Sequence, residues 1–160
     1  MTGSTYGTWL PGDPRGFRTR HHREHVEGDY RNPPPEGTYE EKHARSKELM
    51  TRDAVVLSPE ARELACATFA EVFAFKGAAF GAIAVGAQHY HILVQSTSPR
   101  DLVGVAKKRS ARALSDARLV ARGGVWAVRS RSLPINDESH WTNARAYILK
   151  HERDGASVRA

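Results

Sequence analysis

The sequence predicts an α+β fold in the split β-α-β arrangement of ferredoxin-like domains. In it, helices pack on one face of an antiparallel sheet and the chain has a C-terminal helix that carries a tyrosine. Three observations predict this class. Strand-like and helical stretches follow one another in the order strand, helix, strand, strand, helix, strand, helix. Residues 88–95 alternate in polarity, as a strand with one buried face does. Pro59 and Pro99 each stand where a helix can begin.

The first part of the chain contains one expected strand and a long polar stretch. Residues 1–9 are rich in Thr, Tyr and Trp, which favour strands, and turn residues follow them. Residues 18–57 are polar and irregular, with a proline-rich centre at 33–37. We expect this stretch to form a long loop with a short helix at 39–50, within a single domain that covers 1–160.

The middle of the chain should supply a helix and a pair of strands. Ser58 is a favourable N-cap for a helix that begins at Pro59. Strands are expected at 80–85 and 88–95, on either side of a Gly-Ala pair. The helical spacing of the apolar residues predicts a buried stripe of Ala61, Leu64, Ala65, Thr68, Phe69, Val72 and Phe73.

The last part of the chain should add two helices and one strand. A helix is expected from Pro99 to the glycines at 123–124, and a strand at 125–133. Asp137 is a favourable N-cap for a final helix, which should be closed by Gly155. One face of the helix after Pro99 should contain Leu102, Ala106, Ala113 and Ala117.

The composition is that of an ordinary globular protein. The chain has 160 residues, of which 40% are hydrophobic and 26% charged. No apolar run approaches the roughly 20 residues that span a bilayer, and the beginning of the chain does not resemble a signal peptide. The single cysteine, Cys66, excludes a disulfide framework within the chain and a cysteine-based zinc site. We therefore expect a cytoplasmic location and no membrane partner.

Positive charge is concentrated in one segment. Residues 100–131 contain nine Lys and Arg against two Asp, a balance of +7, so the rest of the chain contributes −1 to the total of +6. A basic segment on a nearly neutral body is typical of proteins that bind a polyanion, most often nucleic acid. A solvated cationic face without a partner is the alternative. The candidate phosphate-binding residues are Lys107, Lys108, Arg109 and Arg112.

Two short motifs carry groups that can bind a metal and attack phosphorus. In the strand expected at 88–95, His89 and His91 point to one face and the apolar residues that alternate with them point to the other. In the last helix, Tyr147 and His151 are four residues apart and share a face. Together they predict a metal site with three imidazole ligands and a tyrosine nucleophile. This is a set of catalytic groups that suits a nuclease.

The chemistry of phosphodiester cleavage explains why these groups would lie together. A divalent cation on His89, His91 and His151 would polarise a phosphoryl oxygen and stabilise the developing charge. Tyr147 could then attack phosphorus in line, giving a covalent phosphotyrosine and a free 3′-hydroxyl. A free phenol has a pKa of about 10, so the cation must also favour the phenolate. Lys150, on the same helix face, is expected to hold a phosphate or to assist that ionisation.

Each motif also has an ordinary structural interpretation. A single His-x-His pair on a strand is a weak signal, and a helix tyrosine is often a half-buried packing residue. On a helical projection, however, Tyr147 falls among polar residues and away from Trp141 and Ile148, which should face the core. The remaining histidines of the long loop, His21, His22, His25 and His43, are expected to be solvated.

These motifs resemble those of the HUH single-tyrosine transposases, in particular the REP-associated tyrosine transposases and their insertion-sequence-200-type relatives. HYHILV is similar to the family's His-hydrophobe-His strand, YILKH to its tyrosine helix, and TYGTWLPGDPRGF at 5–17 to the opening of one bacterial branch. The resemblance implies an HUH nuclease fold with His89 and His91 as ligands of magnesium or manganese. It also implies that Tyr147 attacks single-stranded DNA beside a REP-like hairpin and forms a 5′-phosphotyrosine link, in a bacterial protein that associates with the nucleoid when bound.

One position departs from the family pattern. The third ligand of close relatives is usually Gln or Asn, and the matching residue here is His151. Imidazole favours manganese and later transition metals over magnesium, so we expect manganese to support cleavage better. Family members occur as monomers and as homodimers that exchange the tyrosine helix. The few residues between Leu133 and Asp137 favour a site completed within one chain.

Two other functions are compatible with parts of the pattern. A non-catalytic, domesticated relative would bind hairpin or single-stranded nucleic acid without forming an adduct. A histidine-triad nucleotide hydrolase also alternates histidines along a strand, but Leu93 stands where its third alternating histidine would be expected.

Overall fold

A computed structural model of the chain describes residues 1–15, 17–18, 25–26, 35 and 37–160. The chain divides into two compact units, one formed by Met1–Tyr6 with Val55–Ala160 and the other by Gly7–Ala54. The first unit contains the sheet and all of the histidine and tyrosine residues singled out as candidate ligands and nucleophile. In the described part of the chain, no helix has the length and apolar character needed to cross a membrane.

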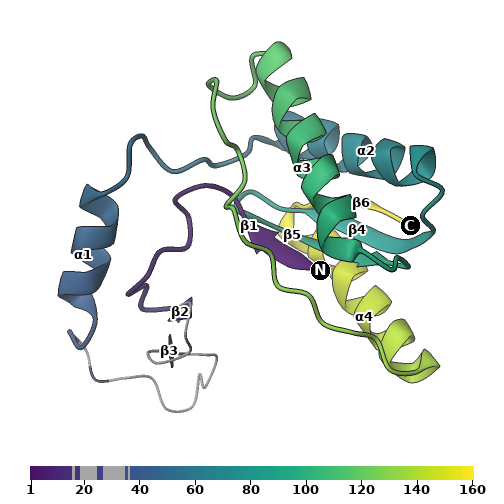
Figure 1. The fold of residues 1–160 in the computed structure, drawn as a ribbon, viewed down its shortest axis with the longest axis horizontal. Helices are drawn as coiled ribbons and strands as arrows, with labels where there is room; N and C mark the ends of the chain where they lie inside the picture. Colours follow the sequence, from purple (N-terminus) through teal and green to yellow (C-terminus); the bar gives the residue numbers. More distant parts are fainter. Residues whose placement is uncertain (16, 19–24, 27–34, 36) are drawn as a thin grey trace. The chain divides into compact units, whose positions relative to one another are not determined.

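The sheet of the first unit has four antiparallel strands in the order β1-β5-β4-β6. These are β1 (Thr2–Ser4), β4 (Phe80–Val85), β5 (His89–Val94) and β6 (Ser157–Arg159). With helices packed on the sheet (Figure 1), this confirms the predicted α+β class. The strand β5 lies between β1 and β4, so the middle of the sheet is occupied by the strand that carries two histidines.

Two helices cover one face of the sheet. They are α2 (Pro59–Phe75) and α3 (Pro99–Asp116), and they share a core with the apolar residues of β4 and β5 (Figure 1). As expected, α2 begins after Ser58, whose side chain accepts a hydrogen bond from the Ala61 backbone N–H at 3.2 Å. At the centre of this core, the Phe69 ring packs edge-on against Tyr90 with centroids 5.6 Å apart.

The helix α3 ends earlier than the sequence indicated, and of the face expected to be buried Leu102 and Ala106 are buried. It stops at Asp116 rather than at the glycines of 123–124, because Arg118 takes a left-handed conformation with φ 59°. The backbone N–H of Leu119 then bonds to the Leu114 carbonyl, which is the usual closure of a Schellman motif. Ala117 is exposed, and the buried residues are Leu102, Val103, Ala106, Ser110 and Leu114.

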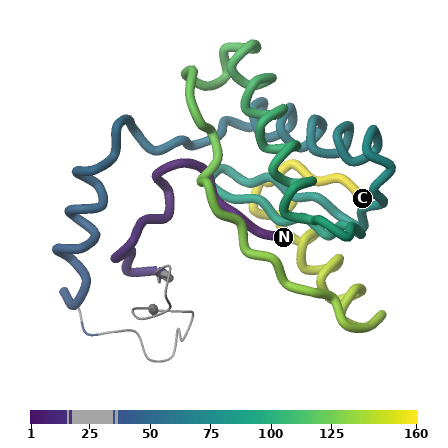
Figure 2. Tube along the Cα trace, viewed as in Figure 1, coloured from purple at the N-terminus to yellow at the C-terminus, as the bar shows by residue number. Residues whose placement is uncertain are grey.

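The strand expected at 125–133 is not formed. This segment runs beside the beginning of the chain and forms two isolated bridges with it, Thr5 with Trp126 and Thr2 with Arg131. Between the two bridges the chain advances by three residues from Thr2 to Thr5 but by five residues from Trp126 to Arg131. The two additional residues prevent a continuous ladder. Figure 2 shows this segment returning along the β1 edge of the sheet towards the last helix.

The strand β6 was not predicted from the sequence. It has only three residues, which is too short for polarity alternation to be recognised. It follows Gly155, whose φ of 76° permits the turn that brings the chain back to β4. Ser157 and Arg159 then both bond to the Glu63 carboxylate of α2, which ties the strand to the helix layer.

The last helix packs on the opposite face of the sheet. This is α4 (Glu138–Lys150), followed directly by the 3-10 turn η1 (His151–Asp154). Asp137 caps α4 as expected, because its carboxylate accepts a hydrogen bond from the His140 backbone N–H at 2.7 Å. The buried side chains of Ala82, Ala84 and Leu93 face Ile148 across this second, smaller core. The final helix therefore lies on the same sheet face as the two strand histidines.

The second unit contains β2 (Phe17–Arg18), β3 (His25–Val26) and α1 (Glu40–Glu48). The helix α1 confirms the short helix expected at 39–50. Within the unit, the Asp13 carboxylate accepts two hydrogen bonds from the Arg15 guanidinium, at 2.9 and 2.6 Å. His21 and His22 lie outside the described residues, as does most of the polar stretch between 18 and 37.

Candidate metal centre

The alternation of β5 places His89 and His91 on the face opposite the main core. Tyr90 and Ile92 are 0% and 1% exposed and belong to the core under α2 and α3. The two histidines are partly buried on the α4 side, and their ring centroids are 5.1 Å apart. Their positions are fixed by pairing on both sides, since β5 is bonded to β1 and to β4.

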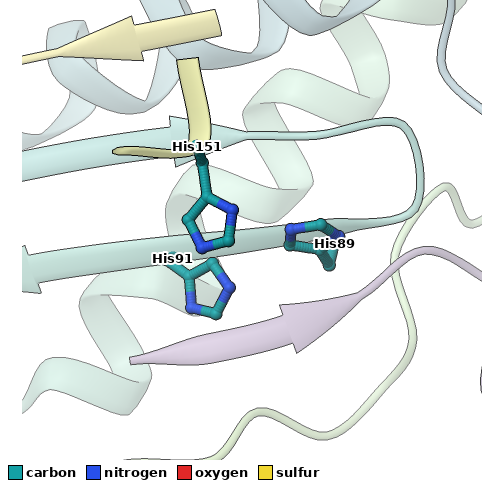
Figure 3. A group of neighbouring side chains, drawn as sticks. All are labelled: His89, His91 and His151. Carbon is teal, nitrogen blue, oxygen red and sulfur yellow. The ribbon is translucent and has the colours of Figure 1, made fainter. Parts of the chain in front are cut away.

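His151 joins them from the end of the last helix. It is the first residue of η1, and its ring stacks on His91 with centroids 4.6 Å apart and an angle of 8° between the planes. The distance from the His151 ring to that of His89 is 5.3 Å. Figure 3 shows the three imidazoles facing one another, two from β5 and one from the turn after α4. One nitrogen from each ring lies within 4.8 Å of the others.

The donor set and its electrostatics fit a divalent metal ion. Burial, together with the neighbouring His89 and His151, lowers the pKa of His91 to about 3. Burial and His151 also lower the pKa of His89. Both imidazoles are therefore neutral at physiological pH, which is the form that binds metals. In addition, Nε2 of His151 is buried without a hydrogen-bond partner, and coordination would satisfy it.

The other nitrogen of His151 faces a carboxylate. Its Nδ1 is 3.6 Å from Oδ2 of Asp154, one turn further along η1. A carboxylate behind a ligating imidazole fixes its tautomer and ring orientation, leaving the opposite nitrogen for the metal. Sequence reasoning did not single out Asp154. The sequence feature that could have indicated it is the His-x-x-Asp spacing, which places both side chains on one side of a helical turn.

Replacing Asp154 by Asn should weaken metal binding about 10- to 100-fold, because the amide keeps the shape of the side chain but not its charge. Glu152→Gln is the matched control, since Glu152 is an exposed carboxylate of the same turn. Isothermal titration of both variants with Mn²⁺ measures the effect. Equal affinities in the two variants would show that Asp154 does not orient the ligand.

Tyr147 lies beside the three imidazoles, as the sequence predicted. It is one helical turn before His151, and the centroids of these two rings are 4.9 Å apart. Its ring is 5.4 Å from that of His91, in an edge-on arrangement. The side chain is 56% exposed, so the phenol is accessible from solvent. A phenol and three imidazoles from two distant segments of one chain therefore lie in contact.

The basic residues singled out on the sequence lie on two different helices. Lys150 is exposed at the end of α4, next to His151. Lys108, Arg109 and Arg112 are exposed on α3, which covers the other face of the sheet. The spacing of residues along a helix could not predict this separation, because it does not determine on which face of the sheet the helix packs.

Lys107 differs from the other α3 cations. Its ammonium donates hydrogen bonds to the carbonyls of Ala127 at 2.6 Å and Val128 at 3.2 Å. Burial lowers its pKa. These contacts hold the irregular segment after α3, and they explain why the carbonyls of residues 127 and 128 are not used in a strand ladder.

Comparisons of the chain with models of protein families, with curated proteins and with solved structures found no match.

Proposed function

We propose that this protein is a metal-dependent, single-strand-specific DNA endonuclease and strand transferase of the HUH single-tyrosine type. The observation that carries the proposal is the contact of Tyr147 with His91 and His151, since a nucleophile must lie beside the group that activates it. The antiparallel sheet with β5 at its centre supports an HUH nuclease fold, which places the histidine strand in the middle of the sheet.

His89, His91 and His151 would hold a divalent cation, which when bound supplies Lewis-acid stabilisation of charge on a phosphoryl oxygen. Tyr147 forms a bond from its phenolic oxygen to phosphorus, and the bond from phosphorus to the 3′ oxygen breaks. The phenolic proton is lost to solvent, and the departing 3′ oxygen takes up a proton from water. The exposure of Tyr147 permits both the approach of DNA and this exchange.

The product of this step retains the energy of the phosphodiester bond in a 5′-phosphotyrosine link. A 3′-hydroxyl from another strand can therefore displace Tyr147 by the reverse reaction, without ATP. Lys150 would contact a phosphate beside the site. The exposed α3 cations Lys108, Arg109 and Arg112, on the other face of the sheet, would hold flanking DNA and contribute salt-dependent affinity.

The test is incubation of the protein with single-stranded hairpin DNA and Mn²⁺, followed by denaturing electrophoresis. A protein–DNA band that survives denaturation, and that is absent when a chelator is added, is the expected result. Cleavage without a covalent band would point to metal-activated water as the nucleophile and would refute the tyrosine mechanism. Binding without cleavage would favour a non-catalytic nucleic-acid-binding protein.

Mn²⁺ should support adduct formation faster than Mg²⁺ by roughly tenfold or more, because an all-imidazole ligand set disfavours the harder ion. Initial rates of adduct formation at equal concentrations of the two chlorides provide the comparison. The variant His151→Gln, which supplies an oxygen donor, should lower the ratio of the rate with Mn²⁺ to the rate with Mg²⁺. Equal or faster rates with Mg²⁺ in the unmodified protein would contradict the prediction.

A further inference from the structure

A groove runs from the candidate metal centre between α4, β5 and the segment at 131–135. Its volume is about 860 Å³, within the range of roughly 300–1,000 Å³ typical of ligand sites. His91 and Tyr147 line one end, so the groove is continuous with the candidate centre. Leu93 and Trp141 line its apolar part, and Leu133 belongs to the segment on its other side. The sequence motifs linked neither Trp141 nor Leu133 to a ligand.

The charge of the groove is suited to an anionic ligand. Among the described residues that line it, none is Asp or Glu, although the chain contains 18 of them. The cation Arg131 lines it together with the neutral imidazole of His91 and the polar residues His140, Ser96, Ser132 and Gln95. An apolar peptide or a lipid chain would not require this lack of carboxylates, whereas a polyanion that lies along the groove does.

Trp141 offers an aromatic surface inside the groove. A side-chain carbon built on Gly81 would be 2.5 Å from Cζ2 of this indole, so the ring rests directly on the glycine backbone of β4. Arg145, one turn later on α4, donates a hydrogen bond from Nε to the Gly81 carbonyl at 3.0 Å and holds the helix at that place. The ring is half-buried, and its remaining surface lines the groove.

We propose that this groove binds unpaired nucleotides of single-stranded DNA next to the phosphate attacked by Tyr147, with one base stacked on Trp141. The inference rests on the proposed function. It adds where the nucleotides next to the attacked phosphate bind. Stacking on an aromatic ring accepts any base, because every base has a π-face. The absence of carboxylates then allows the phosphates on either side of that base to follow the groove.

Two exposed apolar residues provide a matched pair of variants. Leu133 is 54% exposed and lines the groove, while Val128 is 95% exposed and does not line it, although both lie in the segment after α3. Leu133→Glu places a carboxylate in the groove without disturbing the core, and should weaken binding of a fluorescent pentathymidylate by at least about fivefold through charge repulsion. Val128→Glu adds the same charge and should bind as the unmodified protein does.

Trp141 provides a second, chemically different test. Trp141→Ala should weaken binding of pentathymidylate by roughly 5- to 150-fold, the effect typical of losing one stacked base. Trp141→Phe keeps a π-face and should recover most of the affinity. Because Trp141 also packs against Gly81, thermal unfolding must show that each variant is folded at the assay temperature. Fluorescence anisotropy with a chelator present measures binding without cleavage.

The outcomes separate this inference from the proposed function. If the unmodified protein forms the covalent adduct and both Leu133→Glu and folded Trp141→Ala bind pentathymidylate normally, the groove is not the nucleotide site although the nuclease function stands. If no adduct forms but Leu133→Glu and Trp141→Ala still weaken binding while Val128→Glu does not, the groove is confirmed and the catalytic proposal fails. Equal loss in Leu133→Glu and Val128→Glu would mean general repulsion and would overturn the groove assignment.

Discussion

Tyr147→Phe is expected to abolish covalent capture of DNA, lowering the rate of adduct formation by at least about 10⁴-fold, as loss of an essential nucleophile does. The substitution removes one oxygen and leaves the ring that contacts His91 and His151. DNA binding and metal binding should therefore change by less than about twofold. The measurement is denaturing electrophoresis of labelled hairpin DNA after incubation with Mn²⁺.

Tyr39→Phe is the matched control for this experiment. Tyr39 belongs to the second unit, where its ring packs edge-on against Phe17 with centroids 4.9 Å apart. Its adduct yield should equal that of the unmodified protein. A covalent product that persists in Tyr147→Phe would assign the nucleophile to another residue, and mass spectrometry of the DNA-linked peptide would identify it.

The local parts of the candidate centre could be predicted because they depend on short-range periodicity. A strand turns His89 and His91 to one side whatever the rest of the fold does, and a helix aligns Tyr147 with His151 in the same way. The two motifs come together because α4 packs on the face of the sheet to which His89 and His91 point. The small residues Ala82 and Ala84 make room for that helix, and this information lies in a different segment from the motifs.

The parts that could not be predicted depend on contacts between distant residues. The segment at 125–133 has the composition of a strand, but Lys107 of α3 takes two of its carbonyls and the register with β1 shifts by two residues. The three-residue strand β6 forms because it pairs with the edge of β4 and because its Ser157 bonds to the Glu63 carboxylate. Neither effect has a signature within the segment itself.

Replacing His91 by Ala is expected to weaken Mn²⁺ binding by at least about 100-fold, because loss of a direct ligand costs more than loss of the group that orients one. His91 is the central imidazole of the candidate metal centre, in ring contact with His89, His151 and Tyr147. His140→Ala is the matched control, because this imidazole lies on the same sheet face but outside the cluster. Isothermal titration of the two variants with Mn²⁺ gives the comparison.

The same variant has a second expected effect, on the metal-free protein. Burial and the adjacent imidazoles lower the pKa of His91 to about 3 in the folded state, from about 6.5 in an unfolded chain. The unfolded chain therefore binds more protons between these two values, and the stabilising contribution that is complete above pH 6.5 is lost as the pH falls towards 3. Urea unfolding across this range should show a shallower dependence on pH for His91→Ala than for His140→Ala. Parallel profiles, together with unchanged Mn²⁺ affinity, would mean that the three imidazoles are ordinary packing residues and that the metal centre does not exist.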